Sequence, residues 1–300
     1  MGALFTHIIN PFSCADGTKN RKIQEITLQS IREASQLAAE EHRPELWATC
    51  LSIESLPDLN GFHLAPALTQ CVHQETGMET APALPYIDDI LRKGLTCGEA
   101  PYLIYTNMDI ILQPHFYRCV AKWLEESPDA VVINRRRIPE YFLEEPLEKI
   151  WAQAGKPHPG FDCFILKKDL IRHFILDKIC VGIPFVEVSL MHNIFAFAKT
   201  YRLETSLNLT LHIGEEVMPE INKVLYQRNR RIYEQQIYPQ LKSRLQADRF
   251  PHYPKNLLHR MIHYLLNPSY RTHQMLGWET KMILKKIRTN LQDFRWRLLE

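Results

Sequence analysis

The sequence contains no hydrophobic run long enough to span a membrane. A transmembrane helix needs about 18 consecutive apolar residues, and the best candidate segment is interrupted by Glu187 and His192. The first residues, "MGALFTHII", also lack the basic stretch that opens a secretory leader. We therefore expect a cytoplasmic protein without a transmembrane helix.

The sequence also lacks closely spaced cysteines. Its seven cysteines include no C-x-x-C pair, and most of them lie within apolar runs. This spacing argues against zinc sites and redox centres of the paired-cysteine type, and it predicts reduced thiols in the core. The cysteines are Cys14, Cys50, Cys71, Cys97, Cys119, Cys163 and Cys180.

The net charge is small but unevenly distributed. The formal net charge is +2, yet residues 221–300 hold 16 Lys and Arg against 5 Asp and Glu, which leaves 20 against 29 for residues 1–220. Residues 1–220 therefore carry a formal net charge of −9, and residues 221–300 one of +11. A chain of 300 residues, 45% of them hydrophobic, can bury a substantial core. It could form one domain of about 200–250 residues with an appendage, or two equal domains.

Strand-like and helix-like segments alternate along the first half of the chain. The strand-like runs are 3–9, 47–53, 101–106 and 129–134, and the helix-like runs are 22–41, 86–95 and 113–127. This alternation is typical of an open parallel sheet with helices on its faces. We predict the α/β class, with an open, mostly parallel twisted sheet and helices on both faces.

The character of the sequence changes from about Ile213. The following segments are rich in Arg, Tyr, Gln and Leu, and they are punctuated by "FPHYPKN" and "NPSY". This pattern predicts helices that pack on the sheet domain or extend from it. We therefore predict an α/β domain at residues 1–215 and a basic, α-helical C-terminal extension at residues 216–300.

Polar residues follow the predicted strands at the points where the strands end. In open α/β sheets, ligands bind beyond the carboxyl ends of the strands. The polar residues are Asn10 after the first strand, Glu54 and Asp58 after the second, Asn107 and Asp109 after the third, and residues 134–137 after the fourth. Their shared position favours a functional role for the group.

Asp109 follows the apolar run "PYLIYT", which is typical of a strand buried on both faces. An ionised Asp is costly there unless something pairs with it. It could cap the next helix, whose first turn we expect to contain Pro114. However, Asp109 lies five residues before that proline, which is too far for a simple N-cap. A structural role stays open, and a functional one is favoured.

The stretch "TNMDI" and the order of the segments around it resemble glycosyltransferases of the GT-A fold, the family 2-like enzymes. In that family a D-x-D motif ends a central strand and holds a divalent metal against the diphosphate of a sugar nucleotide. Asn107 stands at the first Asp position and Asp109 at the second. The resemblance implies Mn²⁺ or Mg²⁺ at Asp109, because hard cations take oxygen ligands and accept others from phosphate and water. The loss of one carboxylate is expected to weaken metal binding without forbidding it.

Three later segments extend the resemblance to about residue 215. "HPGFDCFILKKDLI" is similar to the acceptor-side segment of these enzymes, and "GIPFVEVSLMHNIFAFAKTYRL" resembles their acidic pair that opens a helix. These likenesses imply Asp162 and Glu187 as competing candidates for the catalytic base. Glu187 is favoured because the helix dipole would keep it ionised, whereas burial beside aromatic residues would raise the pKa of Asp162. In "LNLTLHIGEE", His212 matches the place where many members supply a last metal ligand.

Structural alternatives stay open for several of these residues. His212 could instead be a core histidine. The run Arg135–Arg137 could be a solvated loop, or one or two of its members could face the diphosphate or an acidic acceptor. Asn10 could cap a turn before Pro11, although the matching place in the family contacts the nucleotide base. The residues expected to bind the nucleotide sugar are Asn10, Pro11, Glu54, Asn107, Arg135 and Arg136.

The segment "TKMILKKIRTNLQDFRWRLL" would form an apolar stripe with basic residues around it if it is helical. The stripe could pack on the body of the protein. Alternatively, the helix could lie on an anionic membrane surface, a peripheral attachment that would suit a membrane-held acceptor. No recognised nucleic-acid motif accompanies the basic residues, so no nucleic-acid partner is expected.

The residues and the resemblance together imply a metal-dependent glycosyltransferase-like enzyme. It would move a sugar from a nucleotide-diphosphate donor to a hydroxyl of a saccharide or lipid-linked acceptor. A nucleotidyltransferase of related fold is one alternative, but it would carry a Gly-rich phosphate loop, and "NPFSCADGTKN" has only one glycine. A catalytically silent nucleotide-sugar-binding protein is the other alternative, which Asn107 makes plausible.

Overall fold

The computed structural model describes residues 3–39, 42–73, 83–214, 222–245 and 258. The chain divides into two compact units, Met1–Ser243 and Arg244–Glu300. Almost all of the second unit lies outside the described residues, so the fold below is that of the first. The domain boundary predicted at residue 215 stays a prediction.

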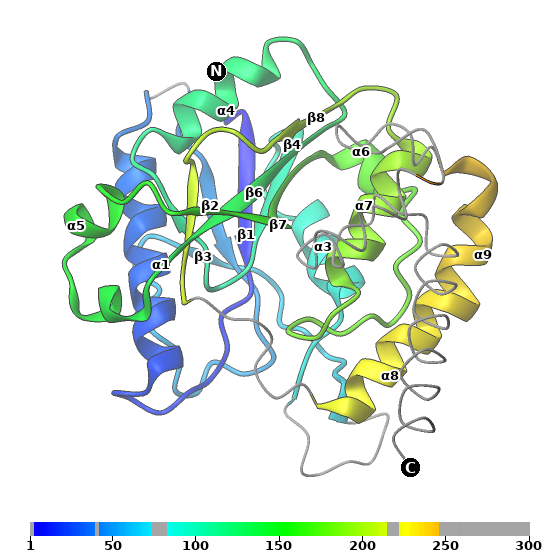
Figure 1. Cartoon of the computed structure of the whole chain (residues 1–300), viewed down its shortest axis with the longest axis horizontal. Helices are drawn as coiled ribbons and strands as arrows, with labels where there is room; N and C mark the ends of the chain where they lie inside the picture. The colour runs from blue at the N-terminus through cyan, green and yellow to red at the C-terminus, as the bar shows by residue number, and fades with distance from the viewer. Residues whose placement is uncertain (1–2, 40–41, 74–82, 215–221, 246–257, 259–300) are drawn as a thin grey trace. The chain divides into compact units, whose positions relative to one another are not determined.

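Nine strands form one sheet at the centre of the first unit (Figure 1). The strands are β1 (Phe5–Ile9), β2 (Glu45–Ala48), β3 (His63–Leu64), β4 (Tyr102–Thr106), β5 (Ile111–Leu112), β6 (Ala130–Ile138), β7 (Lys156–Lys167), β8 (Tyr201–Glu204) and β9 (Thr210–Ile213). Their order is β3-β2-β1-β4-β7-β6-β9-β5, and β8 also pairs with β6. β7 runs antiparallel to both of its neighbours and β5 antiparallel to β9, while the other pairs are parallel. The predicted open, mostly parallel sheet is confirmed, and it is arranged as in a GT-A-like fold.

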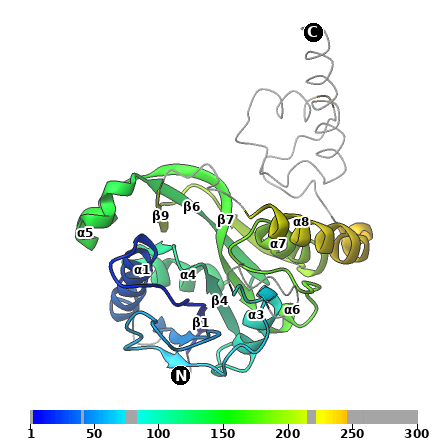
Figure 2. The same ribbon diagram turned by 90° about the horizontal axis from the view of Figure 1, so that it is seen from below.

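Helices cover both faces of this sheet, as predicted (Figures 1 and 2). The helices are α1 (Lys19–Gln36), α3 (Ile87–Leu95), α4 (Phe116–Leu124), α5 (Leu147–Trp151), α6 (Lys168–Ile171), α7 (Val186–Phe197), α8 (Lys223–Ile232) and α9 (Tyr238–Leu241), with 3-10 turns η2 (Glu140–Glu144) and η4 (Lys242–Arg244) and a π-helical turn η3 (Tyr233–Ile237). α1 and α4 lie on one face, and α3, α6 and α7 lie on the other (Figure 2).

The core sits between the sheet and these two helical layers. Every residue of β1 and β4 is buried, which explains why their sequences show no polar alternation. On the α1 and α4 face, Leu28 and Ile31 of α1 and Phe116 of α4 share one hydrophobic cluster with Phe5 of β1. Burial of each such side chain stabilises the fold by roughly 1.5–3 kcal/mol relative to leaving it exposed.

Some predicted boundaries were wrong. The second strand ends at Ala48 rather than near residue 53. The helix predicted at 113–127 begins at Phe116, so Pro114 precedes it, because Gln113 and His115 form the turn that leads into the helix. Arg135–Arg137 do not form a loop: β6 continues through them to Ile138, since β7 and β9 pair with this part of the strand.

The described residues bear on the predictions for the cysteines and for membrane-spanning helices. All seven cysteines are free, and five of them are buried, as expected for reduced core thiols. Within the described part of the chain, no helix has the length and apolar character that a membrane span requires.

Candidate functional site

The turn after β4 places Asp109 opposite His212. β4 ends at Thr106, the chain turns over residues 107–110, and it re-enters the sheet as β5. β5 pairs antiparallel with β9, with Ile111 opposite Leu211, so the residues flanking these positions are brought together. His212 Nε2 lies 3.2 Å from Asp109 Oδ2. We call these two residues the Asp109–His212 pair.

A bulge in β7 places Asp162 at the same edge of the sheet. Cys163 of β7 pairs with both Thr106 of β4 and Ile133 of β6. The next position on β6, Asn134, pairs with Phe161, so β7 contains an extra residue, Asp162, between these two partners. A bulge redirects a side chain without ending the sheet. Here it directs the Asp162 carboxylate toward the end of β4.

Four side chains form a connected network around this carboxylate. The Tyr105 hydroxyl donates to Asn107 Oδ1 at 2.9 Å, and Asn107 Nδ2 donates to Asp162 Oδ1 at 3.0 Å. Arg135 Nη1 lies 3.3 Å from Asp162 Oδ2. Tyr105, Asn107, Arg135 and Asp162 are called the Asp162 network below. Both oxygens of Asp162 thus have partners within the network.

The two carboxylates differ in their electrostatic surroundings. Burial alone would raise the pKa of Asp109, but the hydrogen bond and charge of His212, with the charge of Arg135, outweigh it and lower that pKa below its ordinary value. Burial raises the pKa of Asp162, and the charge of nearby Asp109 adds to the rise, although Arg135 opposes it. The Asp109 carboxylate is therefore held ionised, while ionised Asp162 is more costly.

Glu187 lies in the first turn of α7, where the sequence predicted it. Its Oε1 accepts a hydrogen bond of 2.9 Å from the backbone N–H of Phe161, the residue next to Asp162. The structure therefore brings both candidate bases to the same part of β7. Their catalytic roles stay predictions.

The loops after β1 and β2 lie against each other. Asn10 is buried, and its Nδ2 donates to the Thr49 carbonyl oxygen at 2.7 Å. Asn10 thus ties the ends of the two strands together rather than capping a turn at Pro11. The Ser13 hydroxyl donates to the backbone carbonyl of Glu54, whose side chain is exposed. The nucleotide-binding roles predicted for Asn10, Pro11 and Glu54 are not tested by these contacts.

Arg136 lies next to Arg135 in β6, but its guanidinium binds backbone carbonyl oxygens rather than the Asp162 carboxylate. Its guanidinium donates to the carbonyl oxygens of Ser206 at 3.1 Å and Gly155 at 3.4 Å. Arg136 therefore links two loops at the far end of β6 and β7. Arg135, by contrast, faces the carboxylates, so the two arginines predicted to bind the donor have different surroundings.

The Asp109–His212 pair has unused ligand atoms. Asp109 Oδ1 and His212 Nδ1 are buried, and neither has a hydrogen-bond partner among the residues that the structure describes. Among the residues that the structure describes, no three His, Cys, Asp or Glu side chains group closely enough to hold a metal ion. A metal at this edge would therefore have two protein ligands from the pair and take its other ligands from substrate and water.

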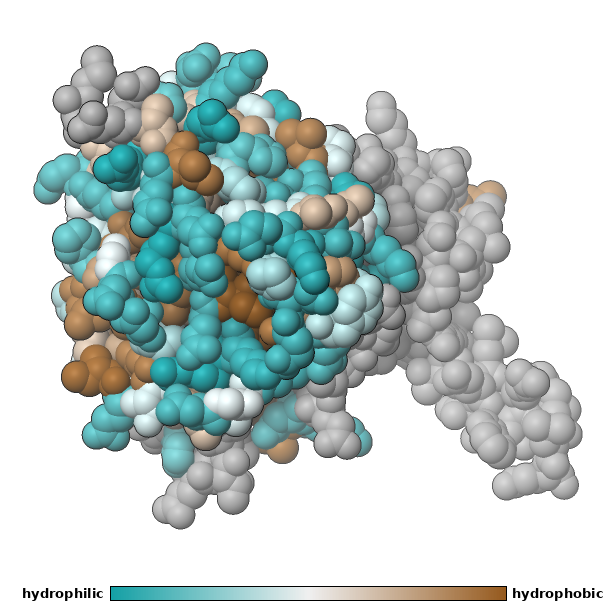
Figure 3. Space-filling view, turned by 90° about the vertical axis from the view of Figure 1, so that its left-hand side faces the viewer, coloured by the Kyte–Doolittle hydropathy of each residue, from teal (hydrophilic) through white to brown (hydrophobic). Residues whose placement is uncertain are grey.

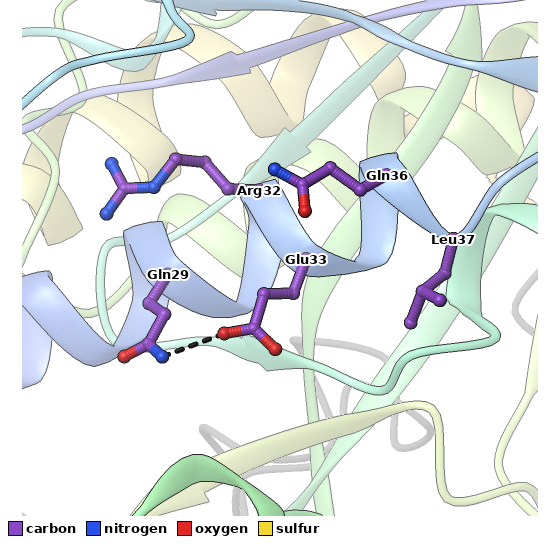
Figure 4. Close-up of a pocket in the computed structure, with 5 residues that line it drawn as sticks. All are labelled: Gln29, Arg32, Glu33, Gln36 and Leu37. Carbon is purple, nitrogen blue, oxygen red and sulfur yellow. Dashed lines mark hydrogen bonds between the residues drawn. The ribbon is translucent and has the colours of Figure 1, made fainter.

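A shallow pocket lies away from this site, on the exposed side of α1 (Figure 4). Its lining consists of Gln29, Arg32, Glu33, Gln36 and Leu37. Gln29 Nε2 donates to Glu33 Oε1 at 2.8 Å within it. The face of the molecule that carries α1 and α5 is largely hydrophilic, with separate hydrophobic spots (Figure 3). The pocket contains none of the residues discussed above. All of its lining side chains come from α1 and its C-cap, so no second element contributes a group to it.

Sequence reasoning missed one member of the Asp162 network, Tyr105. It is buried, and the charges of Asp109 and Asp162 add to the effect of burial in raising the pKa of its hydroxyl. The available signal was its position two residues before Asn107, which puts both on the same side of an extended chain. The contacts of Asp162 gave no such signal, because its bulge depends on pairing with two distant strands.

Comparisons with known proteins match the chain by structure only. No protein-family model and no curated protein matches it. The structure of S. aureus TarS 1-349 in complex with UDP-GlcNAc is 12% identical, covers 91% of this chain and 74% of that chain, and has a TM-score of 0.49. An M. tuberculosis glucosyl-3-phosphoglycerate synthase is 11% identical, with 76% and 77% coverage and a TM-score of 0.42. A complex of that synthase with Mn²⁺, UDP and phosphoglyceric acid has 13% identity, 72% and 71% coverage and a TM-score of 0.40. Similarities this low assign no activity to the chain.

Proposed function

We propose that this chain is a glycosyltransferase that moves a sugar from a nucleotide-diphosphate donor to an acceptor hydroxyl, with Mn²⁺ or Mg²⁺ as cofactor. One observation carries the proposal. Asp109 and His212 meet just beyond the carboxyl end of β4, and within the described part of the chain the second carboxylate oxygen of Asp109 has no hydrogen-bond partner. This edge of an open α/β sheet is where ligands bind.

The chemistry of the Asp109–His212 pair fits a divalent ion. Carboxylate oxygens suit Mg²⁺ and Mn²⁺. Asp109 Oδ2 and His212 Nε2 contact each other, so Asp109 Oδ1 and His212 Nδ1 are the atoms that would be left to hold the ion. The lowered pKa of Asp109 keeps its carboxylate ionised, as a metal ligand must be. The pair therefore fits the group, with the diphosphate of the donor supplying further oxygens.

The bound ion would neutralise the charge that develops on the leaving diphosphate. Arg135 adds fixed positive charge in the same region, since its guanidinium acts on both Asp109 and Asp162. An anionic donor is thus favoured by Arg135. Asn107 donates a hydrogen bond to Asp162 and accepts one from Tyr105, so the Asp162 network orients the carboxylate.

Glu187 is proposed as the base that removes the proton from the acceptor hydroxyl. Its position in the first turn of α7 favours the ionised form. Asp162 is the weaker candidate, because burial raises its pKa and makes its ionised form more costly. A base must be ionised and able to approach the acceptor hydroxyl.

The proposal is tested by sugar-nucleotide turnover. The chain is incubated with Mn²⁺ and a panel of nucleotide sugars that includes UDP-GlcNAc, and release of the nucleoside diphosphate is followed. Glu187→Gln should lower turnover by about 10²- to 10⁴-fold while nucleotide affinity is retained. A turnover near that of the wild type for Glu187→Gln, together with a collapse for Asp162→Asn, would reassign the base to Asp162.

A silent nucleotide-sugar-binding protein is the second candidate, and Asn107 favours it. Asn107 replaces a carboxylate of the family motif and donates its amide to Asp162. Such a protein would bind a nucleoside diphosphate with Mn²⁺ but release no product from any donor in the panel. A nucleotidyltransferase would instead form a sugar nucleotide from a sugar phosphate and a nucleoside triphosphate, which the same product analysis detects.

A further inference from the structure

The segment that leads into α7 has an unfavourable backbone conformation just before Glu187. Phe185, at the N-cap of α7, has φ 92° and ψ −9°, in the left-handed region. Gly182 and Asp177 of the same loop also have positive φ, at 74° and 48°. A bulky residue such as Phe keeps this conformation only when surrounding groups hold it there. The contacts that hold the loop are therefore informative.

Asn229 of α8 holds this loop through three backbone groups. The side chain of Asn229 is buried, and its Oδ1 accepts from the Cys180 N–H at 3.1 Å. Its Nδ2 donates to the carbonyl oxygens of Cys180 at 3.0 Å and Pro184 at 3.2 Å. Pro184 directly precedes Phe185. One side chain thus fixes both ends of the segment that turns into α7.

Aromatic side chains from the same region hold Phe185 itself. The Phe185 ring lies 5.5 Å from the ring of Tyr226 and 5.6 Å from that of Tyr233, measured between centroids. Tyr233 is fully buried and begins the π-helical turn η3. Its hydroxyl also contacts Nδ1 of His192, on α7. Tyr233 therefore contacts α7 at its cap and, two turns later, at His192. Single π-helical turns occur frequently at functional sites.

We infer that Asn229 and Tyr233 are positioning residues that set the place of Glu187 relative to β7. Glu187 lies two residues after Phe185, and its Oε1 reaches the Phe161 N–H beside Asp162 at 2.9 Å. A displacement of the α7 N-terminus moves this carboxylate directly. A misplacement of about 1 Å can lower the rate by about 10²-fold. The contacts that α8 and η3 make with the start of α7 therefore affect the turnover rate, although Asn229 and Tyr233 do not touch substrate. This inference rests on the proposed role of Glu187.

A double-mutant cycle tests it. Asn229→Ala in the full chain should lower sugar-nucleotide turnover by about 10- to 100-fold, with the affinity for a nucleoside diphosphate and Mn²⁺ unchanged within about twofold. In a Glu187→Gln background, the added Asn229→Ala change should have little further effect, because the two residues act through one group. An equal loss of turnover in both backgrounds would overturn the inference.

Matched variants separate positioning from folding. Asn222 caps the start of α8 through the N–H groups of Val224 and Leu225, so Asn222→Ala weakens the same helix without touching the loop. It should leave turnover near the wild-type value. Tyr233→Phe keeps the ring contact with Phe185 and should retain most activity, whereas Tyr233→Leu should behave like Asn229→Ala. Equal losses in the Phe and Leu variants would contradict a role for the ring.

A structural measurement distinguishes failure of this inference from failure of the proposed function. Amide hydrogen exchange of residues 180–187 is followed in the wild type, Asn229→Ala and Asn222→Ala. The inference predicts faster exchange at these residues in Asn229→Ala only. If exchange is faster but Glu187→Gln keeps full turnover, the positioning contacts exist and the base assignment is wrong. Unchanged exchange in Asn229→Ala would overturn the positioning role, whatever the chain catalyses.

Discussion

Asp109 is a carboxylate at the end of a buried strand, and its neighbours explain how it is kept there. His212 contacts one of its oxygens, and the charge of Arg135 acts on it as well. Its side chain is 37% exposed, so it is not sealed in the core. These surroundings lower the pKa of Asp109, because His212 and Arg135 favour its ionised form over the protonated one. The interpretation of Asp109 as a helix cap is not supported, because α4 begins at Phe116.

Replacement of His212 by Ala should weaken metal binding without abolishing it. The variant loses the imidazole and, with it, the hydrogen bond that lowers the pKa of Asp109, but it keeps the carboxylate. The dissociation constant for Mn²⁺ should rise by about 10- to 100-fold, the range seen when groups that support a metal ligand are removed. Calorimetric titration with Mn²⁺ measures this, and His173→Ala, at an exposed histidine, is the control. An unchanged Mn²⁺ affinity would make His212 a structural histidine.

At the scale of elements, the alternating pattern predicted β1, β2, β4 and β6 and the edge at which they end, but not the short strands β3 and β5. A buried run such as 102–106 is typical of a central strand, and parallel strands bring their carboxyl ends together. The pattern could not give the direction of β7, which depends on pairing with β4 and β6. For the same reason it missed the bulge at Asp162. It left a solvated loop at Arg135–Arg137 open, whereas pairing on both sides keeps these residues in β6.

The end of β8 provides a stability prediction for the sheet. Glu204 is buried, and its carboxylate accepts from the hydroxyl of Ser206, from Arg202, and from the N–H groups of Ser206 and Leu207. Burial alone would raise the pKa of Glu204, but these hydrogen bonds lower it from an ordinary 4.5 to about 2. Because the pKa is depressed in the folded state, the stabilisation is complete above about pH 4.5 and is lost as the pH falls toward about 2.

Glu204→Gln should therefore lower the free energy of unfolding at pH 7 by up to about 3 kcal/mol. The difference from the wild type should shrink as the pH falls through 4.5. Urea unfolding at pH 7 and pH 3 measures both effects. Glu144→Gln, which removes one exposed ion pair with Lys22, should change stability little at either pH. A difference for Glu204→Gln that is independent of pH would contradict this account of the carboxylate.

At the scale of the whole molecule, the site is assembled from segments that are far apart in the chain. The Asp109–His212 pair joins the turn after β4 to β9, which follows only after α4 to β8, and Glu187 comes from a helix whose start is held by α8. Local sequence pattern therefore identified the candidates but not their partners. Asn229 and Tyr233 became visible only through contacts across the fold.

The basic tail carries a separate prediction, which lies outside the described residues. If residues 280–300 form a helix that attaches to anionic lipid, their removal should reduce sedimentation with vesicles rich in phosphatidylserine. Activity on a soluble acceptor should be spared. Vesicles of neutral lipid serve as the control, because electrostatic attraction requires anionic headgroups. A truncated chain that becomes insoluble would instead indicate that the apolar stripe packs on the protein.

The most direct test of the central claim is calorimetric titration of nucleoside diphosphates in the presence and absence of Mn²⁺. The account predicts Mn²⁺-dependent binding to the wild type and its loss in Asp109→Ala, with the melting temperature close to that of the wild type. Asp169→Ala, at a carboxylate on the exposed side of α6, should bind like the wild type. Unchanged Mn²⁺-dependent binding in Asp109→Ala would contradict the claim that the Asp109–His212 pair holds the metal.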